Sequence, residues 1–314
     1  MEHYSQTINE NIIMGTGTWS WGDRLYWGYG RNYQESDCQE AFRTSIEVGI
    51  PFFDTAEVYG QGLSEKMLGD FIKKSGMSCL VASKFMPFPW RLRRASLITA
   101  LRGSLSRLGL PKIDLYQIHQ PLPPLTIESW MEAMVEAYMS GLIGAVGVSN
   151  YNHEQVQRAN DVLIRQGIQL TSNQIEYSLL NRKIEKNGLL KFCQDLNITV
   201  IAYSPLAMGV LTGKYSPEKP PQGLRRGRYN PDYLELIEPI ISKLRRIGAQ
   251  HAGKTPGQVA LNWVIYKGAV PIPGAKNRTQ IIQNAGALGW SLSEEEVEEL
   301  DQVSDSVLYQ QGGD

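Results

Sequence analysis

The sequence predicts an α/β fold built as a single (β/α)8 barrel, and three observations lead to this prediction. Short apolar segments alternate with helix-like segments along the whole chain. The short segments are apolar throughout rather than at every second position, which is typical of parallel strands covered on both faces. The glycine pattern that usually opens a doubly wound sheet is incomplete, because Ser20 stands at its third glycine position after Gly15 and Gly17.

Eight segments are expected to form strands because each is short and rich in β-branched or aromatic residues. These segments are residues 12–16, 51–54, 79–83, 113–118, 143–148, 172–175, 198–203 and 269–272. No change of composition separates one strand–helix unit from the next. We therefore expect residues 1–314 to form one domain.

The helices between these strands have recognisable start signals. Ser64 is expected to cap the helix that follows the second strand. Capping-box spacing is found in three further places, namely Asn152 with Gln155, Thr255-Pro256 with Gln258, and Ser293 with Glu296. Residues 207–233, rich in Gly, Pro and Arg, form a long loop after the seventh strand, a length typical of a functional loop. Helices follow, and residues 302–314 are expected to form a frayed tail.

The composition excludes several classes of function. The chain has 314 residues, of which 42% are hydrophobic and 20% charged, with a formal net charge of −1. This balance gives no electrostatic case for binding nucleic acid or an anionic membrane. The N-terminus has no signal-peptide pattern and no stretch reaches the apolar length of a membrane span. Three separate cysteines without a CxxC motif suit a reducing compartment, so a cytoplasmic location is expected.

Four side chains stand where a barrel enzyme places its chemistry. Asp54, Lys84 and His119 each end an apolar strand-like run, and Tyr59 follows Asp54 by five residues. In a parallel barrel the carboxyl ends of the strands meet on one face, so these side chains are expected to lie together. Taken singly, each could have a purely structural role, such as a lysine that reaches the surface or an interior histidine. Their joint occurrence favours a site.

The chemistry of such a site follows from its pKa values. A free phenol has a pKa near 10 and is a poor acid at neutral pH. An ammonium at Lys84 is expected to lower the pKa of Tyr59, and Asp54 to keep that ammonium charged and in place. Tyr59 can then donate a proton to a carbonyl oxygen as hydride reaches the carbon. His119 can donate a second hydrogen bond to the same oxygen.

Other chemistries lack their signatures in this sequence. The four histidines are too far apart for a metal-binding motif, so no metal is expected. A serine hydrolase would carry a GxSxG elbow, which is absent. Nothing distinctive supports a flavin or pyridoxal phosphate.

The motifs that surround these residues resemble the aldo-keto reductase family of NAD(P)H-dependent carbonyl reductases, which are built on the (β/α)8 barrel. The resemblance covers nearly the whole chain. It is carried by FFDTAEVYGxGxSExMLG (52–69), SK (83–84), DLYQIHQP (114–121), GVSN (147–150), NQIEYSLLNR (173–182), AYSPLAMGVLTGKY (202–215) and PIPGAKN (271–277). Its details are most similar to the branch that contains potassium-channel β-subunits and bacterial or plastid reductases.

The resemblance implies a nicotinamide cofactor, NADPH or NADP+, across the strand ends. By motif, Ser149, Asn150 and Gln174 would bind the carboxamide, and Tyr203 would stack on the nicotinamide ring. The loop over the pyrophosphate would contain Ser204, Leu206, Gly209 and Lys214. Only about eleven residues precede the first predicted strand, so the family's N-terminal hairpin is expected to be shortened.

The segment 273–284 matches the part of the family that binds the adenosine phosphate. Gly274, Gln280 and Gln283 replace the Lys, Arg and Glu common in other branches, and Asn284 matches an adenine-contacting asparagine. The nearby charges of Lys276 and Arg278 favour NADPH over NADH, because they could bind a 2′-phosphate. Alternatively, both side chains simply face solvent.

Large aromatic residues on two adjacent loops predict an apolar cleft for a small aldehyde or ketone. The expected substrate contacts are Trp19, Trp21, Phe85 and Trp90. The arginines of segment 91–94 are a further hypothesis, as recruiters of an acidic substrate, and those of 225–228 are another candidate anion site. Such clusters more often form a charged surface exposed to solvent.

The favoured function is reduction of an aldehyde or ketone by NADPH, with Tyr59 as proton donor. Two alternatives use the same fold. The chain could be a cofactor-bound regulatory or interaction subunit, or its physiological direction could be the oxidation of an alcohol or sugar. No protein partner is indicated by the sequence.

Overall fold

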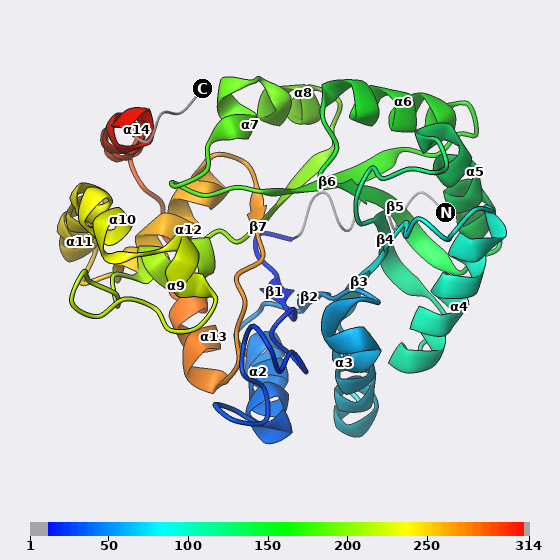
Figure 1. Ribbon diagram of the computed structural model, residues 1–314, viewed down its shortest axis with the longest axis horizontal. Helices are drawn as coiled ribbons and strands as arrows, with labels where there is room; N and C mark the ends of the chain where they lie inside the picture. The colour runs from blue at the N-terminus through cyan, green and yellow to red at the C-terminus, as the bar shows by residue number, and fades with distance from the viewer. Residues whose placement is uncertain (1–11, 311–314) are drawn as a thin grey trace.

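The structure, a computed structural model, describes residues 12–310. Eight strands form one sheet in which each strand pairs in parallel with the next one along the chain. Figure 1 shows these strands at the centre of the molecule. The strands are β1 (Thr16–Gly17), β2 (Phe52–Asp54), β3 (Leu80–Phe85), β4 (Ile113–Ile118), β5 (Ile143–Ser149), β6 (Leu170–Glu176), β7 (Thr199–Tyr203) and β8 (Val270–Pro271).

Backbone hydrogen bonds join the last strand to the first. The amide of Gly15 donates to the carbonyl of Pro271 at 3.0 Å, and that of Gly17 donates to Pro273 at 3.1 Å. These bonds close the sheet, so the predicted (β/α)8 barrel is confirmed. The last strand is shorter than expected, since β8 covers only two residues of the predicted segment 269–272. Proline has no amide hydrogen to donate, and Pro271 and Pro273 therefore limit the ladder there.

Helices surround the strands and cover their outer surface (Figure 1). Short 3₁₀ helices, η1 (Tyr59–Gly62) and η2 (Ala207–Thr212), follow β2 and β7. The α-helices are α2 (Glu35–Glu47), α3 (Leu63–Ser75), α4 (Ala95–Leu108), α5 (Ile127–Met139), α6 (His153–Ile164), α7 (Lys183–Lys186), α8 (Leu189–Asp195), α9 (Arg225–Arg228), α10 (Pro231–Leu236), α11 (Glu238–Gln250), α12 (Pro256–Tyr266), α13 (Arg278–Ala285) and α14 (Glu294–Gln310).

The three predicted capping boxes are confirmed, whereas Ser64 is not a cap. Helix α3 begins at Leu63, two residues before the start that a Ser64 cap implies. The Ser64 hydroxyl is buried and donates to the carbonyl of Thr18. The long segment 207–233 is not one open loop, because η2, α9 and the start of α10 lie within it.

The expectation of a frayed tail is wrong for residues 302–310, which continue α14. Apolar side chains of this part of the helix, such as Val307, are buried in the core, and this packing keeps the last turns helical. The predicted shortening of the N-terminal hairpin concerns residues 1–11, which lie outside the described residues.

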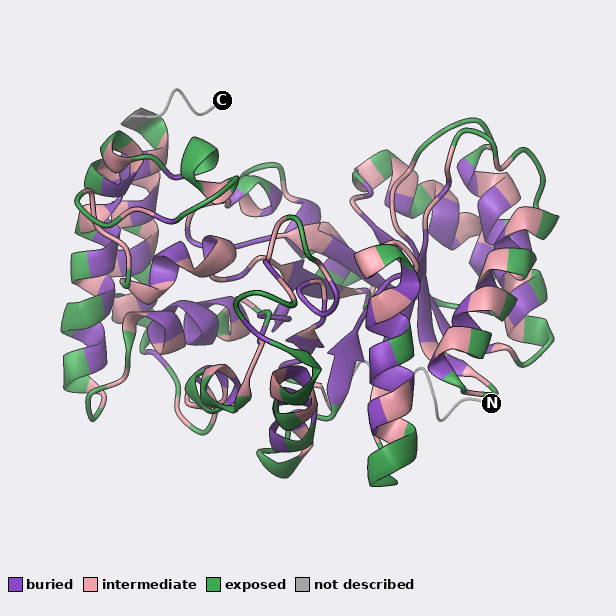
Figure 2. Ribbon diagram, turned by 60° about the horizontal axis from the view of Figure 1, so that its bottom comes forward, coloured by how far each residue is buried: buried purple, intermediate pink, exposed green. Residues whose placement is uncertain are grey.

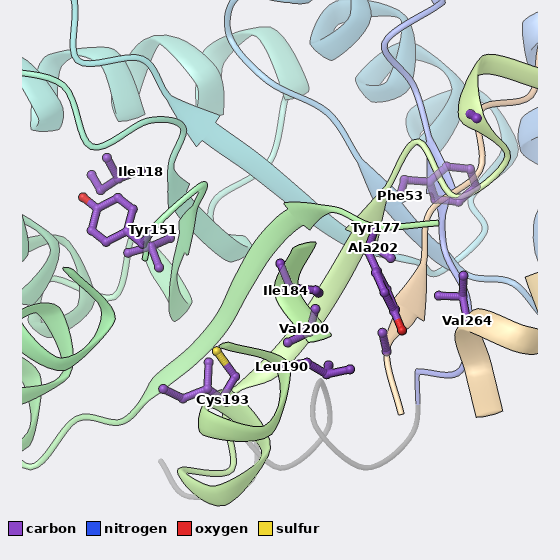
Figure 3. Close-up of a cluster of buried hydrophobic side chains, with 14 of the residues drawn as sticks. Phe53, Ile118, Tyr151, Tyr177, Ile184, Leu190, Cys193, Val200, Ala202 and Val264 are labelled. Atoms are coloured by element: carbon purple, nitrogen blue, oxygen red, sulfur yellow. The ribbon is translucent and has the colours of Figure 1, made fainter. Parts of the chain in front are cut away.

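Alternation along the strands separates two apolar cores. The interior of the barrel is filled by one set of inward-facing side chains, namely Phe52, Ala82, Leu115, Ala145, Ile201 and Ile272. Their neighbours in sequence face outward and join the larger core under the helices, where Figure 3 shows Val200 of β7 near Ile184 and Leu190. Figure 2 shows the same division, with buried strands and helices exposed on their outer faces.

The interior layer has a direct consequence for the next residues along the strands. Two positions after Phe52, Ala82 and Leu115 the same inward direction is taken by Asp54, Lys84 and Gln117, all buried. The barrel is therefore apolar at this level and polar at the next one toward the carboxyl ends.

Close packing of α3 on α4 predicts the effect of a small substitution. A Cβ added to Gly69 would lie 2.3 Å from the carbonyl oxygen of Leu108, so the helix backbones must separate. We expect Gly69→Ala to destabilise the protein by about 1–3 kcal/mol in chemical unfolding. The matched control is Gly103→Ala in α4, whose added Cβ meets only the flexible end of Arg107, 3.2 Å away. That variant should be as stable as the parent or slightly more stable. Equal stabilities for the two variants would contradict the packing argument.

Candidate active site

A cavity of about 700 Å³ opens at the carboxyl ends of the strands. Its described lining includes the last residues of three strands, Asp54 of β2, Ser149 of β5 and Tyr203 of β7, together with His119 directly after β4. In parallel barrels this face carries the active site. The structure thus brings Asp54 and His119, predicted from separate strand ends, to one cavity that Tyr59 also lines. Lys84 does not belong to the lining, but it contacts both Asp54 and Tyr59.

A buried ion pair lies at the base of this cavity. The Lys84 ammonium is 2.5 Å from Oδ1 of Asp54 and donates a second bond to the carbonyl of Thr55 at 2.8 Å. Both side chains are buried, with 0% and 2% of their surface exposed. Burial lowers the pKa of Lys84, but the opposing effects of Asp54 and Tyr59 are together larger and hold it above its ordinary value. The ammonium is therefore charged at neutral pH.

The second oxygen of Asp54 is held by two side-chain amides. Gln174 Nε2 donates to Oδ2 at 2.8 Å and Gln117 Nε2 at 3.3 Å. A Cβ at Gly147 would lie 2.8 Å from Cγ of Gln117, so this glycine leaves the room that the amide needs. Sequence reasoning missed Gln117, although a polar residue two positions before His119 in an apolar strand was a signal that could have found it.

Tyr59 reaches the ion pair from the turn after β2. Its hydroxyl is 3.3 Å from the Lys84 ammonium, which also lies 4.9 Å from the centre of its ring. The next residue, Gly60, has φ of +54° and approaches the backbone of Gly22 closely, a conformation that suits glycine. Burial raises the pKa of Tyr59, and Lys84 offsets only part of this rise. Lys84 thus lowers the pKa of Tyr59 as predicted, but burial outweighs this effect, so the pKa lies above its ordinary value and the phenol is protonated at neutral pH.

His119 completes this group as a neutral side chain. Its ring centre is 5.8 Å from that of Tyr59, with the ring planes at 80°. Burial, with the nearby Lys84 charge, lowers the pKa of His119 to about 3. Its buried Nδ1 has no hydrogen-bond partner among the described residues. A neutral imidazole in the cavity wall can donate a hydrogen bond to a ligand.

Hydrogen bonds also connect the polar side chains at the ends of β5, β6 and β7. Ser149 donates to the carbonyl of Gln174 at 2.8 Å, and Asn150 donates to the Ser149 hydroxyl at 3.0 Å. The Tyr203 hydroxyl donates to the amide oxygen of Asn150 at 3.0 Å. Asn150 and Ser204 both adopt positive φ, so the chain turns sharply after β5 and after β7, the two strands on either side of β6. Unusual backbone of this kind gathers at ligand sites.

The far end of the cavity is cationic. Lys214, Arg225 and Lys276 line it, whereas the described lining contains a single carboxylate, Asp54, which is already paired with Lys84. Burial lowers the pKa of Lys276 to about 8, and the charges of Arg225 and Lys214 add to this effect. The Nε of Arg225 is buried without a hydrogen-bond partner in the described part of the chain. This donor set fits a phosphate-bearing ligand.

Aromatic rings hold two of these cations in place. The Arg225 guanidinium lies 5.2 Å from the ring centre of Trp27 and donates to the Tyr215 hydroxyl at 3.0 Å. The Lys276 ammonium lies 4.7 Å from the ring centres of Trp27 and Tyr33. Sequence reasoning noted the arginine run but not that α9 brings Arg225 into the cavity.

The predicted cofactor residues line this cavity with one exception. Thirteen of the fourteen belong to its lining, namely Ser149, Asn150, Gln174, Tyr203, Ser204, Leu206, Gly209, Lys214, Gly274, Lys276, Gln280, Gln283 and Asn284. Arg278 does not line it. Its Nη1 is 3.5 Å from the Thr44 hydroxyl and 3.9 Å from the Glu47 carboxylate, so this cation interacts with α2 instead.

Only one of the four predicted substrate contacts lines the cavity. Trp19 does so, and its ring centre is 6.4 Å from that of Tyr59. Trp21 is fully buried in the core, where its indole donates to the carbonyl of Ala275 at 2.8 Å. Phe85 is also fully buried and packs on Trp130.

Trp90 is 71% exposed and stacks on Phe88 at 4.5 Å, outside the cavity. The predictions for Trp21, Phe85 and Trp90 are therefore wrong. Among the residues that sequence reasoning did not select, the cavity is lined by Val58, which precedes Tyr59, by Gln120, which follows His119, and by Met86.

Within residues 12–310, no group of three or more His, Cys, Asp or Glu side chains is arranged to hold a metal ion. None of the helices in this same range combines the length and the apolar composition that a membrane crossing requires.

Comparison with known proteins gives a consistent result. Residues 11–305 match the model of the aldo/keto reductase family. The chain is 41% identical over 304 residues to the chloroplastic pyridoxal reductase of Arabidopsis thaliana, covering 92% of this chain and 82% of the relative. Among solved structures, it is similar to an aldo/keto reductase from Klebsiella pneumoniae in complex with NADP and acetate, at 31% identity, 93% and 91% coverage of the two chains and a TM-score of 0.70.

A second solved structure is the glycerol dehydrogenase from Gluconobacter oxydans. It is 26% identical, with 95% of this chain and 91% of that chain covered and a TM-score of 0.81. The predicted cofactor is of the kind bound in the Klebsiella structure, and both the family model and the fold span nearly all of this chain. The chain belongs to the aldo/keto reductase family of oxidoreductases.

Proposed function

We propose that this protein reduces an aldehyde or ketone to an alcohol with NADPH. The observation that carries the proposal is the contact of the Tyr59 hydroxyl with the buried Lys84–Asp54 ion pair, in the wall of a cavity whose other end is cationic. A proton donor and a phosphate-binding region thus share one cavity. A hydride-transfer enzyme that uses a phosphorylated cofactor needs both.

When bound, NADPH supplies the hydride that reaches the carbonyl carbon. As the carbon–oxygen double bond opens, negative charge develops on the oxygen, and the Tyr59 hydroxyl donates its proton there. Lys84 stabilises the resulting tyrosinate, since its ammonium lies 3.3 Å away. The neutral His119 donates a hydrogen bond to the same oxygen and orients it.

We assign the cavity-lining residues to successive parts of the cofactor. We assign the nicotinamide end to Ser149, Asn150, Gln174 and Tyr203. Because Nε2 of Gln174 bonds to Asp54, its other amide atom, Oε1, is the one offered to the carboxamide. We assign the phosphates to the loop Ser204–Lys214 and to Lys276, with Gly274, Gln280, Gln283 and Asn284 at the adenosine end. Arg278 has the weaker claim because it does not line the cavity.

For the substrate we propose a planar aromatic aldehyde. Trp19 lines the cavity beside Tyr59, and it stacks on Tyr26 with ring centres 5.1 Å apart, which fixes a flat apolar wall. The Arabidopsis relative, at 41% identity, is named for its activity on pyridoxal. Pyridoxal and simple aromatic aldehydes are therefore the first substrates to assay, and the reverse oxidation of alcohols belongs in the same panel.

The role of Tyr59 is tested by Tyr59→Phe. Loss of the proton donor should lower kcat by about 10²–10⁴-fold, while the Kd for NADPH stays within about twofold of the parent because the ring is retained. NADPH consumption measured against the carbonyl panel gives the rate, and fluorescence titration gives the Kd. Near-parental turnover by Tyr59→Phe would overturn the assignment. No turnover by the parent on any substrate, with NADPH still bound, would favour a regulatory subunit.

The pH profile tests the protonation states. Reduction requires the protonated phenol, and the pKa of Tyr59 is raised, so this form persists through neutral pH and is lost only on the alkaline side of 10. The pKa of His119 is about 3, so the imidazole stays neutral throughout. With saturating NADPH, kcat/KM should therefore be flat from about pH 5 to pH 9. A step near pH 6.5 that disappears in His119→Gln would show a charged histidine in the cycle and contradict this account.

Cofactor preference is tested at Lys276. We expect Lys276→Met to weaken NADPH binding by about tenfold or more and NADH binding little, since only NADPH carries the 2′-phosphate. Arg278→Met is the matched control and should have the smaller effect. Because the pKa of Lys276 is about 8, the ammonium is lost above that pH, so the preference of the parent for NADPH should decline there. An unchanged NADPH-to-NADH ratio in Lys276→Met would remove this residue from the site.

A further inference from the structure

A second, partly buried ion pair lies behind the cavity wall. The Arg91 guanidinium donates to both oxygens of Glu57, at 2.6 Å from Nη1 and 3.0 Å from Nη2. The side chains are 19% and 9% exposed. The guanidinium also lies over the rings of Phe85 and Phe88, 4.6 and 5.3 Å from their centres. Planar, two-point pairing with stacking is specific to arginine and fixes both partners.

This pair holds the peptide backbone of Met86 from two directions. The Met86 amide donates to Oε1 of Glu57 at 2.7 Å, and its carbonyl accepts a bond from Nη1 of Arg91 at 2.8 Å. Met86 lines the cavity, whereas neither Glu57 nor Arg91 belongs to its described lining. The ion pair therefore acts on the cavity through the backbone, without touching a ligand there.

The same pair links two loops that contribute to the reaction. Glu57 lies two residues before Tyr59 in the turn after β2, and its amide donates to the carbonyl of Lys84 at 3.4 Å. Arg91 and Met86 both belong to the loop that follows β3, the strand that contains Lys84. The turn that bears the proton donor is thus tied to the loop that forms the adjacent wall.

Another arginine of this loop, Arg94, is arranged differently. Arg94, on the same loop, pairs with Glu132 at the surface, where the side chains are 56% and 51% exposed. The hypothesis that the arginines of segment 91–94 recruit an acidic substrate fails for Arg91, because its two-point partner is a carboxylate of the protein itself.

We propose that Glu57 and Arg91 are positioning residues, which hold the Met86 wall against the Tyr59 turn so that a bound carbonyl meets the phenol. This inference rests on the proposed function, because the position that it fixes matters only for a ligand at Tyr59. A small displacement of a reacting group lowers the reaction rate strongly, by about 100-fold for a displacement of 1 Å.

The test uses the full-length protein with Arg91→Lys and Arg91→Met. Lysine keeps the charge but offers one nitrogen in place of the planar two-nitrogen fork that bonds to the two Glu57 oxygens. We expect Arg91→Lys to raise KM for the carbonyl and to lower kcat, with kcat/KM reduced by about tenfold or more, while the Kd for NADPH stays within about twofold. Arg94→Met is the matched control and should leave kcat, KM and the NADPH Kd unchanged.

A double variant guards against loss of folding in Arg91→Met, which leaves a buried carboxylate unpaired. Glu57→Gln with Arg91→Met removes both charges and keeps an acceptor for the Met86 amide. Its thermal stability should be higher than that of Arg91→Met. Its KM should stay raised above that of the parent, because the bond to the Met86 carbonyl is still missing. A purely structural role predicts that KM recovers with stability, and that outcome would overturn the proposal.

Amide hydrogen exchange provides a readout that does not depend on turnover. The peptide containing Met86 should exchange faster in Arg91→Lys than in the parent and be unchanged in Arg94→Met. Parental exchange together with parental kcat and KM in folded Arg91→Lys would overturn the proposal. If the parent reduces no carbonyl, the proposed function fails, and the exchange of Met86 then decides by itself whether the pair holds the backbone.

Discussion

The site depends on one constraint, which is that an ammonium has been buried at the centre of a barrel. A fully buried Lys84 would be too costly to keep charged without compensation. Asp54 provides a carboxylate at 2.5 Å, and the carbonyl of Thr55 provides a second acceptor. The amides of Gln117 and Gln174 in turn bond to the other oxygen of Asp54. Four strands, β2, β3, β4 and β6, therefore contribute to keeping one positive charge beside the phenol of Tyr59.

Alternation along the strands accounts for which parts of this site could be predicted from the sequence. Asp54, Lys84 and His119 were recognisable because a polar residue rarely ends a buried apolar strand unless it has a polar partner or a ligand there. The same rule shows why Phe85 was misplaced: since Lys84 faces inward, its neighbour in the strand must face the helices, where Phe85 packs on Trp130. An aromatic residue beside an inward-facing polar one belongs to the outer core.

Contacts between distant loops were beyond the reach of sequence patterns. Trp21 and Trp19 are two residues apart, yet one donates its indole hydrogen to the carbonyl of Ala275 in the core and the other lines the cavity. The pairing of Arg91 with Glu57 joins residues 34 positions apart and has no local signature. The predicted start of helix α3 was wrong for a similar reason, because the Ser64 hydroxyl donates to the carbonyl of Thr18 instead of capping its own helix. Tertiary partners decided each of these cases.

Charge is distributed unevenly along the cavity, and this unevenness orients whatever binds there. At the end beside Tyr59, Asp54 and Lys84 cancel, while the low pKa of His119 and the raised pKa of Tyr59 keep both side chains neutral. At the other end Lys214, Arg225 and Lys276 have no carboxylate partner among the described lining residues. An elongated anion therefore has one favourable orientation, with its phosphates at the cationic end and its uncharged end beside the phenol. The neutral end also suits an uncharged carbonyl. In the proposed reduction the carbonyl oxygen acquires negative charge only as it reacts, so Lys84 and Tyr59 would stabilise the transition state more than the ground state.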